Sequence, residues 1–181
     1  MGGQADAGFV RDATAADASA IATVQATSWA HDYDWPPEIF TALQASDPEM
    51  QWARAVIAPP GPGYRLIVAT HSGDVVGYAA LAPSHDADAE AGEAQIVAWE
   101  VEPAHRGHGH GSRLLAAVAD HARSIGAHSL SIWIAAHDEA RRRLLTEAGF
   151  GPDGAHRTVQ VDDGWGHDDV TMRQVRLGCG L

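Results

Sequence analysis

The apolar positions along the chain switch between two periods, and the switches divide it into strands and helices. Short apolar runs typical of strands occur at 9–13, 65–70, 75–81, 96–101 and 129–135, and more weakly near 155–161 and 169–176. Helical spacing or helix-start signals occur at 14–28, from 36, from 46, at about 112–125 and at 138–148. This order of strands and helices predicts a mixed sheet with helices on both faces.

Short local signals mark where several of these elements begin and end. Thr14 and Asp17 have the spacing of a capping box at the start of the first helix. The sequence HSGD at 71–74 predicts a tight turn between two strands. The sequence PSHDADAEAGE at 83–93 has no apolar period and predicts an acidic loop, and Gly149 is placed to end the last helix.

The composition fits one soluble domain. The 181 residues are 45% hydrophobic and 20% charged, which is enough to bury a core. The formal net charge of -12 repels phosphate backbones and favours cationic ligands, so we expect no nucleic-acid partner. The chain has no apolar run of ~18 residues, no secretory signal and a single cysteine, Cys179. We therefore expect a cytoplasmic protein without disulfides or membrane contact.

The strongest chemical signal is the sequence VEPAHRGHGHGSRLL at residues 101–115. A strand ends at Val101, and glycines lead from it directly into an amphipathic helix. The first N–H groups of a helix have no helical acceptor, and its N-terminus carries a partial positive charge. The turn therefore predicts an anion-binding site, which Arg106 and Arg113 are placed to flank with charge-assisted hydrogen bonds.

Two common phosphate-binding patterns fail at this turn. The P-loop requires Gly-Lys-Ser/Thr, and all twelve basic residues of this chain are arginine. The pattern Gly-x-Gly-x-x-Gly fails because Ser112 stands at its last position when counted from Gly107. The pattern that fits is Arg106-x-x-Gly109-x-Gly111. It resembles the acetyl-CoA motif Gln/Arg-x-x-Gly-x-Gly/Ala of the GNAT superfamily of N-acetyltransferases.

The resemblance extends over most of residues 9–176. The segment HDEARRRLLTEAGF (137–150) is similar to the family's Asn-x-x-Ala…Tyr-x-x-x-Gly-Phe segment, and SGDVVGYAAL (72–81) to its central hairpin. The resemblance implies the GNAT fold, an α/β (α+β in some schemes) domain with a mixed central sheet of about six to seven strands. Helices cover both faces, and the fourth and fifth strands splay apart. The expected organisation is a flexible segment at 1–8, one domain at 9–176 and a tail at 177–181.

The resemblance also implies a reaction, the transfer of an acetyl group from acetyl-CoA to a primary amine of a small molecule or a peptide N-terminus. The pantetheine arm would lie in the splay and the pyrophosphate at the glycine turn. The amine would attack the thioester directly, so Cys179 is not expected to be a nucleophile. The residues expected to bind acetyl-CoA are Trp99, Val101, Arg106, Gly107, His108, Gly109, His110, Gly111, Ser112 and His137.

The catalytic acid and base stay open, because two positions depart from the family pattern. Leu145 stands where family members often carry the tyrosine that protonates the departing thiolate. Tyr33, Tyr78 and several histidines are alternative acids. His137 stands where the family has an asparagine that contacts the pantetheine, and it is a candidate catalytic group or a helix cap. Glu100, at the end of a strand, is the candidate base.

The acceptor pocket of the family falls at two segments of this chain. One carries Tyr33 and Trp35 between aspartates, and the other is the acidic loop at 85–93. Carboxylates beside aromatic rings suit a cationic amine. Tyr33 and Trp35 are therefore the candidate substrate-binding residues.

Three other interpretations remain. A metal protein would use His105, His108 and His110, but these lie in the anion-binding turn and no carboxylate or cysteine completes a known spacing, so no metal is expected. The missing tyrosine leaves a catalytically silent acyl-CoA-binding sensor or regulatory module as the alternative function. Another acyl donor, such as propionyl- or succinyl-CoA, would fit the same motif. Homodimers are common among similar proteins, although nothing in the sequence specifies an interface.

Overall fold

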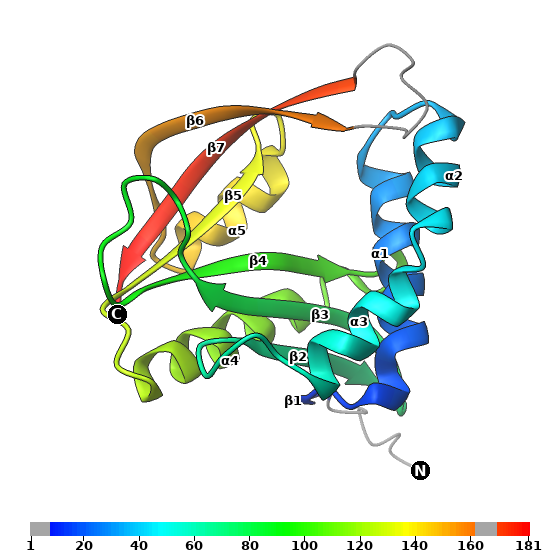
Figure 1. Ribbon diagram of the computed structural model, residues 1–181, viewed down its shortest axis with the longest axis horizontal. Coiled ribbons are helices and arrows are strands. Elements are labelled where there is room, and N and C mark those ends of the chain that lie inside the picture. Colours follow the sequence, from blue (N-terminus) through cyan, green and yellow to red (C-terminus); the bar gives the residue numbers. More distant parts are fainter. Residues whose placement is uncertain (1–7, 162–169) are drawn as a thin grey trace.

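One mixed sheet organises the part of the chain that the structure describes, residues 8–161 and 170–181 of a computed structural model. Its strand order is β1-β2-β3-β4-β5-β7-β6, and only the pairing of β4 with β5 is parallel (Figure 1). The strands are β1 (Phe9–Asp12), β2 (Arg65–His71), β3 (Asp74–Pro83), β4 (Glu93–Val101), β5 (Ser129–Ala135), β6 (Gly151–Val161) and β7 (Val170–Gly180). The predicted α/β fold class with a mixed sheet is therefore confirmed.

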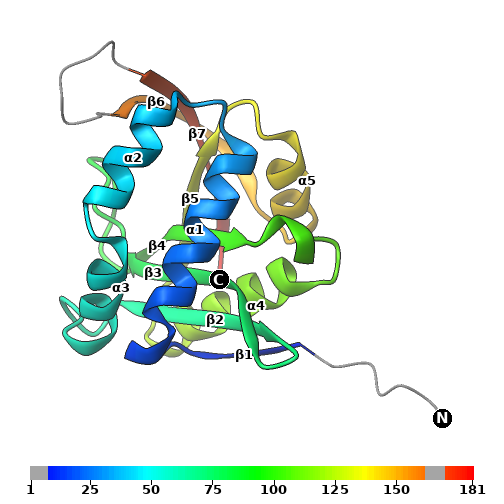
Figure 2. The same ribbon diagram turned by 90° about the vertical axis from the view of Figure 1, so that its right-hand side faces the viewer.

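Helices cover both faces of this sheet, as predicted (Figure 2). On one face lie α1 (Ala18–Asp32) and α3 (Pro48–Ile57), with α2 (Pro37–Ala45) beside them. On the other face lie α4 (His110–Ser124) and α5 (Glu139–Glu147). Within residues 8–161 and 170–181, no helix is both long and apolar enough to cross a membrane.

Among the element boundaries that differ from the prediction, two affect how the elements are held together. The first helix does not end near Ser28 but continues to Asp32. Its last turns are anchored to the end of β4, because the Ser28 hydroxyl donates to the carbonyl of Val101 and the Trp29 indole donates to Glu100. The last strand continues to Gly180, so most of the tail predicted at 177–181 is sheet structure paired with β5. The flexible segment predicted at 1–8 lies, apart from its last residue, outside the described residues.

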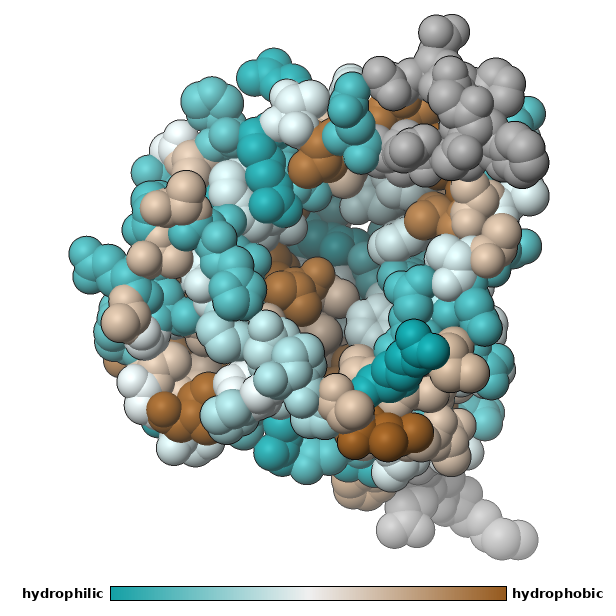
Figure 3. Space-filling model, in the orientation of Figure 1, coloured by the Kyte–Doolittle hydropathy of each residue, from teal (hydrophilic) through white to brown (hydrophobic). Residues whose placement is uncertain are grey.

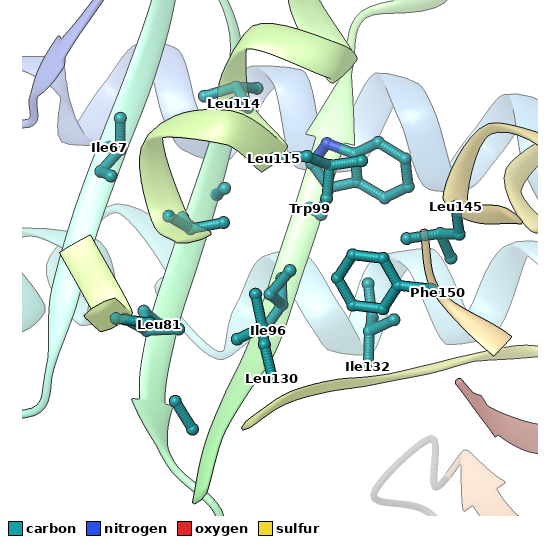
Figure 4. Close-up of a cluster of buried hydrophobic side chains, with 14 of the residues drawn as sticks. Ile67, Leu81, Ile96, Trp99, Leu114, Leu115, Leu130, Ile132, Leu145 and Phe150 are labelled. Carbon is teal, nitrogen blue, oxygen red and sulfur yellow. The ribbon is translucent and has the colours of Figure 1, made fainter. Parts of the chain in front are cut away.

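Apolar side chains form two cores, one on each face of the sheet. The smaller core packs Ile21 and Val24 of α1 against β2 and β3. The larger core lies under α4 and α5 and includes Ile96, Trp99, Leu114, Leu115, Ile132, Leu145 and Phe150 (Figure 4). The two cores pack against opposite faces of the central strands. This packing fixes where the ends of β4 and β5 lie.

The strands β4 and β5 separate part of the way along their length. The parallel ladder joins Glu93–Ile96 to Ser129–Ile132 and extends no further. At the same point Val97 has no partner in β3, because Ala80 pairs with Ala98 and Leu81 pairs with Ile96. Such a bulge bends a strand and increases its twist. The predicted splay is therefore confirmed, and the last residues of β4 have a free edge on the side of β5.

Asp17 fixes the junction between β1 and α1. Its buried carboxylate accepts hydrogen bonds from the Arg11 guanidinium at 2.7 and 2.8 Å and from the Thr14 backbone at 2.7 Å, which confirms the predicted cap. The Arg11 hydrogen bonds hold the pKa of Asp17 well below its usual range. A lowered folded-state pKa stabilises the protein above the pKa of an unfolded aspartate, about 3.9, and this stabilisation is lost as the pH falls.

The variant Asp17→Asn should therefore lower the free energy of unfolding by about 1–3 kcal/mol at neutral pH. The loss should be smaller at about pH 3 than at neutral pH, because the contribution of this carboxylate begins to fall once the pH drops below the unfolded-state pKa of about 3.9. Urea denaturation at both pH values measures the difference. Asp120→Asn removes an exposed ion pair with Arg123 and serves as the control, with an expected change below about 0.5 kcal/mol. An equal loss for Asp17→Asn at both pH values would contradict this account.

Candidate active site

The glycine turn after β4 leads into the N-terminus of α4. A short 3-10 turn at Pro103–His105 leaves the strand, and α4 begins at His110. Gly107 and Gly109 have φ angles of 79° and 78°, in the left-handed region that favours glycine. The first N–H groups of α4 therefore lie next to Gly107 and Gly109, which have no side chains to block an approaching ligand. This is the arrangement of an anion site.

A cavity of about 760 Å³, here called the donor cavity, extends from this turn along the free edge of β4 to the start of α5. Figure 3 shows the surface hollowed between the two halves of the sheet. The predicted acetyl-CoA residues that line it are Trp99, Val101, Arg106, Gly107, Gly109, His110, Gly111, Ser112 and His137. The predicted His108 does not line it, because its ring turns back onto the carbonyl of Arg106 at 3.0 Å.

A second cavity of about 530 Å³, here called the acceptor cavity, lies between the segment after α1 and the start of β7. Its lining includes Asp34 and Trp35 from the first segment and Met172 from the second. Tyr33 and His137 line both cavities. These two residues therefore mark the place where the two cavities meet.

The acidic loop at 85–93, predicted to help form the acceptor pocket, lines neither cavity. Asp86 and Asp88 bind the Arg176 guanidinium, and Asp86 also accepts a hydrogen bond from the Trp133 indole. These contacts hold the loop against the outer side of β5 and β7. Its carboxylates therefore have a local structural role.

The guanidinium groups of the turn bind protein groups instead of flanking the turn as free cations. Arg106 donates to the carbonyl of Val101 at 2.9 Å and to both oxygens of Asp32 at 2.6 and 2.9 Å. Arg113 donates to the carbonyl of His108 at 3.1 Å. Arg106 still lines the donor cavity and Arg113 does not, and the contact of either arginine with an anion stays a prediction. Through Asp32, Arg106 ties the turn to α1.

Arg141 of α5 connects three elements at the wall of the donor cavity. Its guanidinium binds Glu100 at 2.9 Å and Asp32 at 3.3 Å, and it donates to the carbonyl of Trp99 at 3.0 Å. Burial alone would lower the pKa of Arg141, but Glu100 outweighs it and raises that pKa. Burial alone would likewise raise the pKa of Asp32, and the hydrogen bonds from Arg106 instead lower it. Arg141 and Asp32 are therefore both ionised at neutral pH.

The predicted base Glu100 lines neither cavity. Its side chain is 6% exposed, and its carboxylate accepts hydrogen bonds from Arg141 and from the Trp29 indole, the latter at 3.2 Å. Glu102 accepts a hydrogen bond from His105 at 2.8 Å. Both carboxylates are therefore engaged by neighbouring residues.

Four histidines from β2, the turn and the first residue of α4 form a cluster, and two of them, His105 and His110, line the donor cavity. The ring centroids of His71 and His105 lie 5.4 Å apart, and those of His71 and His110 lie 5.6 Å apart. Burial, reinforced by Arg113, lowers the pKa of His110, so its imidazole is neutral at physiological pH. Among the described residues, no group of three histidine, cysteine or acidic side chains is arranged to hold a metal ion.

The sequence prediction missed two residues of this site. One is Asp32, which accepts hydrogen bonds from both Arg106 and Arg141, and the other is Arg141 itself. Three arginines follow one another at 141–143, and their sequence alone does not tell which one faces the cavity. The pairing becomes visible only because α1 extends to Asp32 and reaches the start of α5. Leu145, at the position of the family's tyrosine, is fully buried in the core and lines neither cavity.

The chain was compared with known proteins. The model of the Acetyltransferase (GNAT) family matches residues 25–150. A protein named IAA acetyltransferase from Azospirillum brasilense is 34% identical over 93 residues, which cover 51% of this chain and 58% of that protein. The match thus spans little more than half of the relative's length.

Solved structures share the fold over nearly the whole chain. The PaiA N-acetyltransferase of Thermoplasma acidophilum, in complex with coenzyme A, superposes with a TM-score of 0.72 at 12% identity and covers 97% of this chain and 99% of its own. A Salmonella typhimurium protein of acetyltransferase type, solved with its cofactor acetyl-CoA, has a TM-score of 0.67 at 23% identity and covers 97% and 94%. The family match confirms the resemblance found in the sequence, and this chain belongs to the acetyltransferase (GNAT) family.

Proposed function

We propose that the protein transfers the acetyl group of acetyl-CoA to a primary amine of a small molecule or a peptide N-terminus. The observation that carries the proposal is the meeting of two cavities at Tyr33 and His137. One cavity ends at the glycine turn. The other is lined by the aromatic rings of Tyr33 and Trp35 and by charged side chains of both signs, Asp34 and Arg173. A group-transfer enzyme needs its two substrates to touch at one point, and this geometry provides it.

The donor cavity fits acetyl-CoA, which when bound supplies an activated acyl group as a thioester. The N–H groups at Gly107–Ser112 would hold the pyrophosphate. The carbonyls of Trp99 and Val101 accept hydrogen bonds from Arg141 and Arg106, so they lie at the free edge of β4. The N–H of a strand residue points to the same edge as its carbonyl, so these two N–H groups face the cavity and would bind the pantetheine arm.

The acceptor cavity suits a cationic amine. The rings of Tyr33 and Trp35 are stacked, with centroids 4.4 Å apart and planes at 7°. An ammonium group is attracted to the face of such rings, and the exposed carboxylate of Asp34 adds attraction of the same sign. This supports Tyr33 and Trp35 as substrate-binding residues.

In this proposal His137 accepts the proton that the amine loses as it attacks the thioester. His137 is exposed and lines both cavities, and an imidazole is the side chain that most often accepts a proton in catalysis. Glu100 is a positioning residue that holds Arg141. No covalent enzyme intermediate is required, and burial raises the pKa of the Cys179 thiol in β7, which makes it a poor nucleophile.

The second candidate function is a silent acyl-CoA-binding sensor, and the buried Leu145 favours it. A thiol-release assay with acetyl-CoA against polyamines, aminoglycosides, amino acids and N-terminal peptides decides between the two, run beside calorimetric CoA binding. Turnover on one class supports the enzyme and names its acceptor. Binding without turnover on every class supports the sensor.

The donor site predicts that Ser112→Glu weakens acetyl-CoA binding. Ser112 is exposed, lies in the first turn of α4 and lines the donor cavity. A glutamate there suits the helix but repels the pyrophosphate, so the Kd should rise about 10- to 100-fold, and more at low salt. Ala116→Glu, one turn later and outside the cavity, is the control and should leave the Kd within about twofold. Calorimetry that finds equal affinities in both variants would remove the turn from the donor site.

The proposed base predicts that His137→Gln lowers kcat by about 10²-fold and removes the acidic limb of its pH profile. Glutamine keeps hydrogen-bonding capacity but takes up no proton, so acetyl-CoA affinity should stay near that of the wild type. His156→Gln, an exposed histidine on β6 outside both cavities, serves as the control. An unchanged acidic limb in His137→Gln would assign the proton acceptor to another group.

A further inference from the structure

The departing thiolate of CoA needs a proton, and α5 offers no free hydroxyl at the donor cavity. Its one hydroxyl, that of Thr146, donates to the carbonyl of Arg142 and lines neither cavity. Leu145 is fully buried and lies in the core with Phe150 and Ile132 (Figure 4). The donor must therefore come from another element that reaches the place where the thioester and the amine meet. The structure brings two such side chains to the contact of the two cavities, His137 and Tyr33.

We propose that the hydroxyl of Tyr33, from the segment after α1, is the proton donor to the departing thiolate. The inference rests on the proposed acetyl transfer and assigns the second of its two proton transfers. His137 takes the first, because a neutral imidazole accepts a proton, whereas the phenol of tyrosine has one to give.

Tyr33 is held in place by contacts on both sides. Its ring is stacked on Trp35, which in turn packs against Trp29 at 5.9 Å and Phe40 at 5.8 Å between ring centroids. The preceding residue, Asp32, is bound by Arg106 from the glycine turn and by Arg141 from α5. Contacts with the glycine turn, with α5 and with the aromatic residues of the acceptor cavity therefore restrict the position of Tyr33. A catalytic group needs such a fixed position.

The charges around Tyr33 keep the phenol protonated and still support the transfer. Burial raises the pKa of Tyr33 to about 12, so the hydroxyl retains its proton across the working pH range. The Arg141 guanidinium acts in the opposite direction and favours the phenolate that forms after donation, while Glu100, Asp138 and Asp32 oppose it. Tyr78 is not a competitor, because it is fully buried and lines neither cavity.

The transfer balances with these two groups alone. The lone pair of the neutral amine forms the C–N bond to the thioester carbon, and the C–S bond breaks with its electron pair on sulfur. The proton lost from nitrogen goes to the His137 imidazole, and the Tyr33 hydroxyl proton goes to sulfur. Exchange with water then returns the phenolate and the imidazolium to their starting states.

The first test needs no acceptor and no turnover. The thiol of free CoA, bound to the wild type and to Tyr33→Phe, is titrated by the ultraviolet absorbance of the thiolate. A hydroxyl that donates to sulfur favours the thiolate, so the thiol pKa should be lower in the wild type by roughly one unit. Tyr64→Phe, which removes a hydroxyl hydrogen-bonded to His85 outside both cavities, should match the wild type. Equal thiol pKa values in the wild type and Tyr33→Phe would overturn the assignment.

The second test uses turnover. Tyr33→Phe keeps the ring that stacks on Trp35, so CoA affinity and acceptor KM should hold while kcat falls about 10²-fold. A fluorinated tyrosine at position 33 lowers the phenol pKa, and it should bring a basic limb into the kcat profile that the wild type lacks. A change in acceptor KM alone, or no new basic limb, would make Tyr33 a substrate-binding residue only. A wild type that binds CoA with the Tyr33-dependent thiol pKa yet acetylates no amine would overturn the proposed function and leave the hydrogen bond standing.

Discussion

The separation of β4 from β5 is the constraint on which the rest of the site depends. Pairing stops after Ile96 and Ile132, where Val97 bulges out of the ladder with β3. Had the ladder continued, the N–H and C=O groups of Trp99 and Val101 would be used within the sheet. Because it stops, these groups face a cavity, and the glycine turn and α4 follow at the same end of the strand.

A network of paired charges closes the open end of the splay. Arg106, Arg141, Asp32 and Glu100 join the glycine turn, α5, α1 and β4 through hydrogen bonds of 2.6 to 3.3 Å. Replacing one of these four side chains by an uncharged one would leave a partly buried charge without its partner, which would lower the free energy of unfolding. The network therefore sets the distance between the anion-binding turn and the segment that carries Tyr33, and so couples the two cavities in space.

The sequence was sufficient for the features that depend on neighbouring residues. The cap at Thr14 and Asp17, the glycine turn and the end of the last helix at Gly149 all follow from short patterns with a direct physical reason, and the structure has them. Periodicity located the seven strands. The last strand was predicted to end at 176 instead of Gly180, because its pairing with β5 has no local signal in the sequence.

The parts that could not be predicted join residues far apart in the chain. Nothing near Arg106 indicates that its partner is Asp32, and nothing near Tyr33 indicates that it lines the same two cavities as His137. The acidic loop is a further example, because nothing near Asp86 or Asp88 indicates that these carboxylates bind Trp133 and Arg176 within the fold. Composition identifies the chemical character of a segment, whereas the topology of the sheet decides what that segment faces.

A crystal structure of the protein with CoA would test the central claim most directly, because it locates both ends of the ligand at once. The account predicts the pyrophosphate at the N–H groups of Gly107–Ser112 and the sulfur between Tyr33 and His137, where the two cavities meet. A CoA molecule bound with its sulfur away from both residues would contradict it.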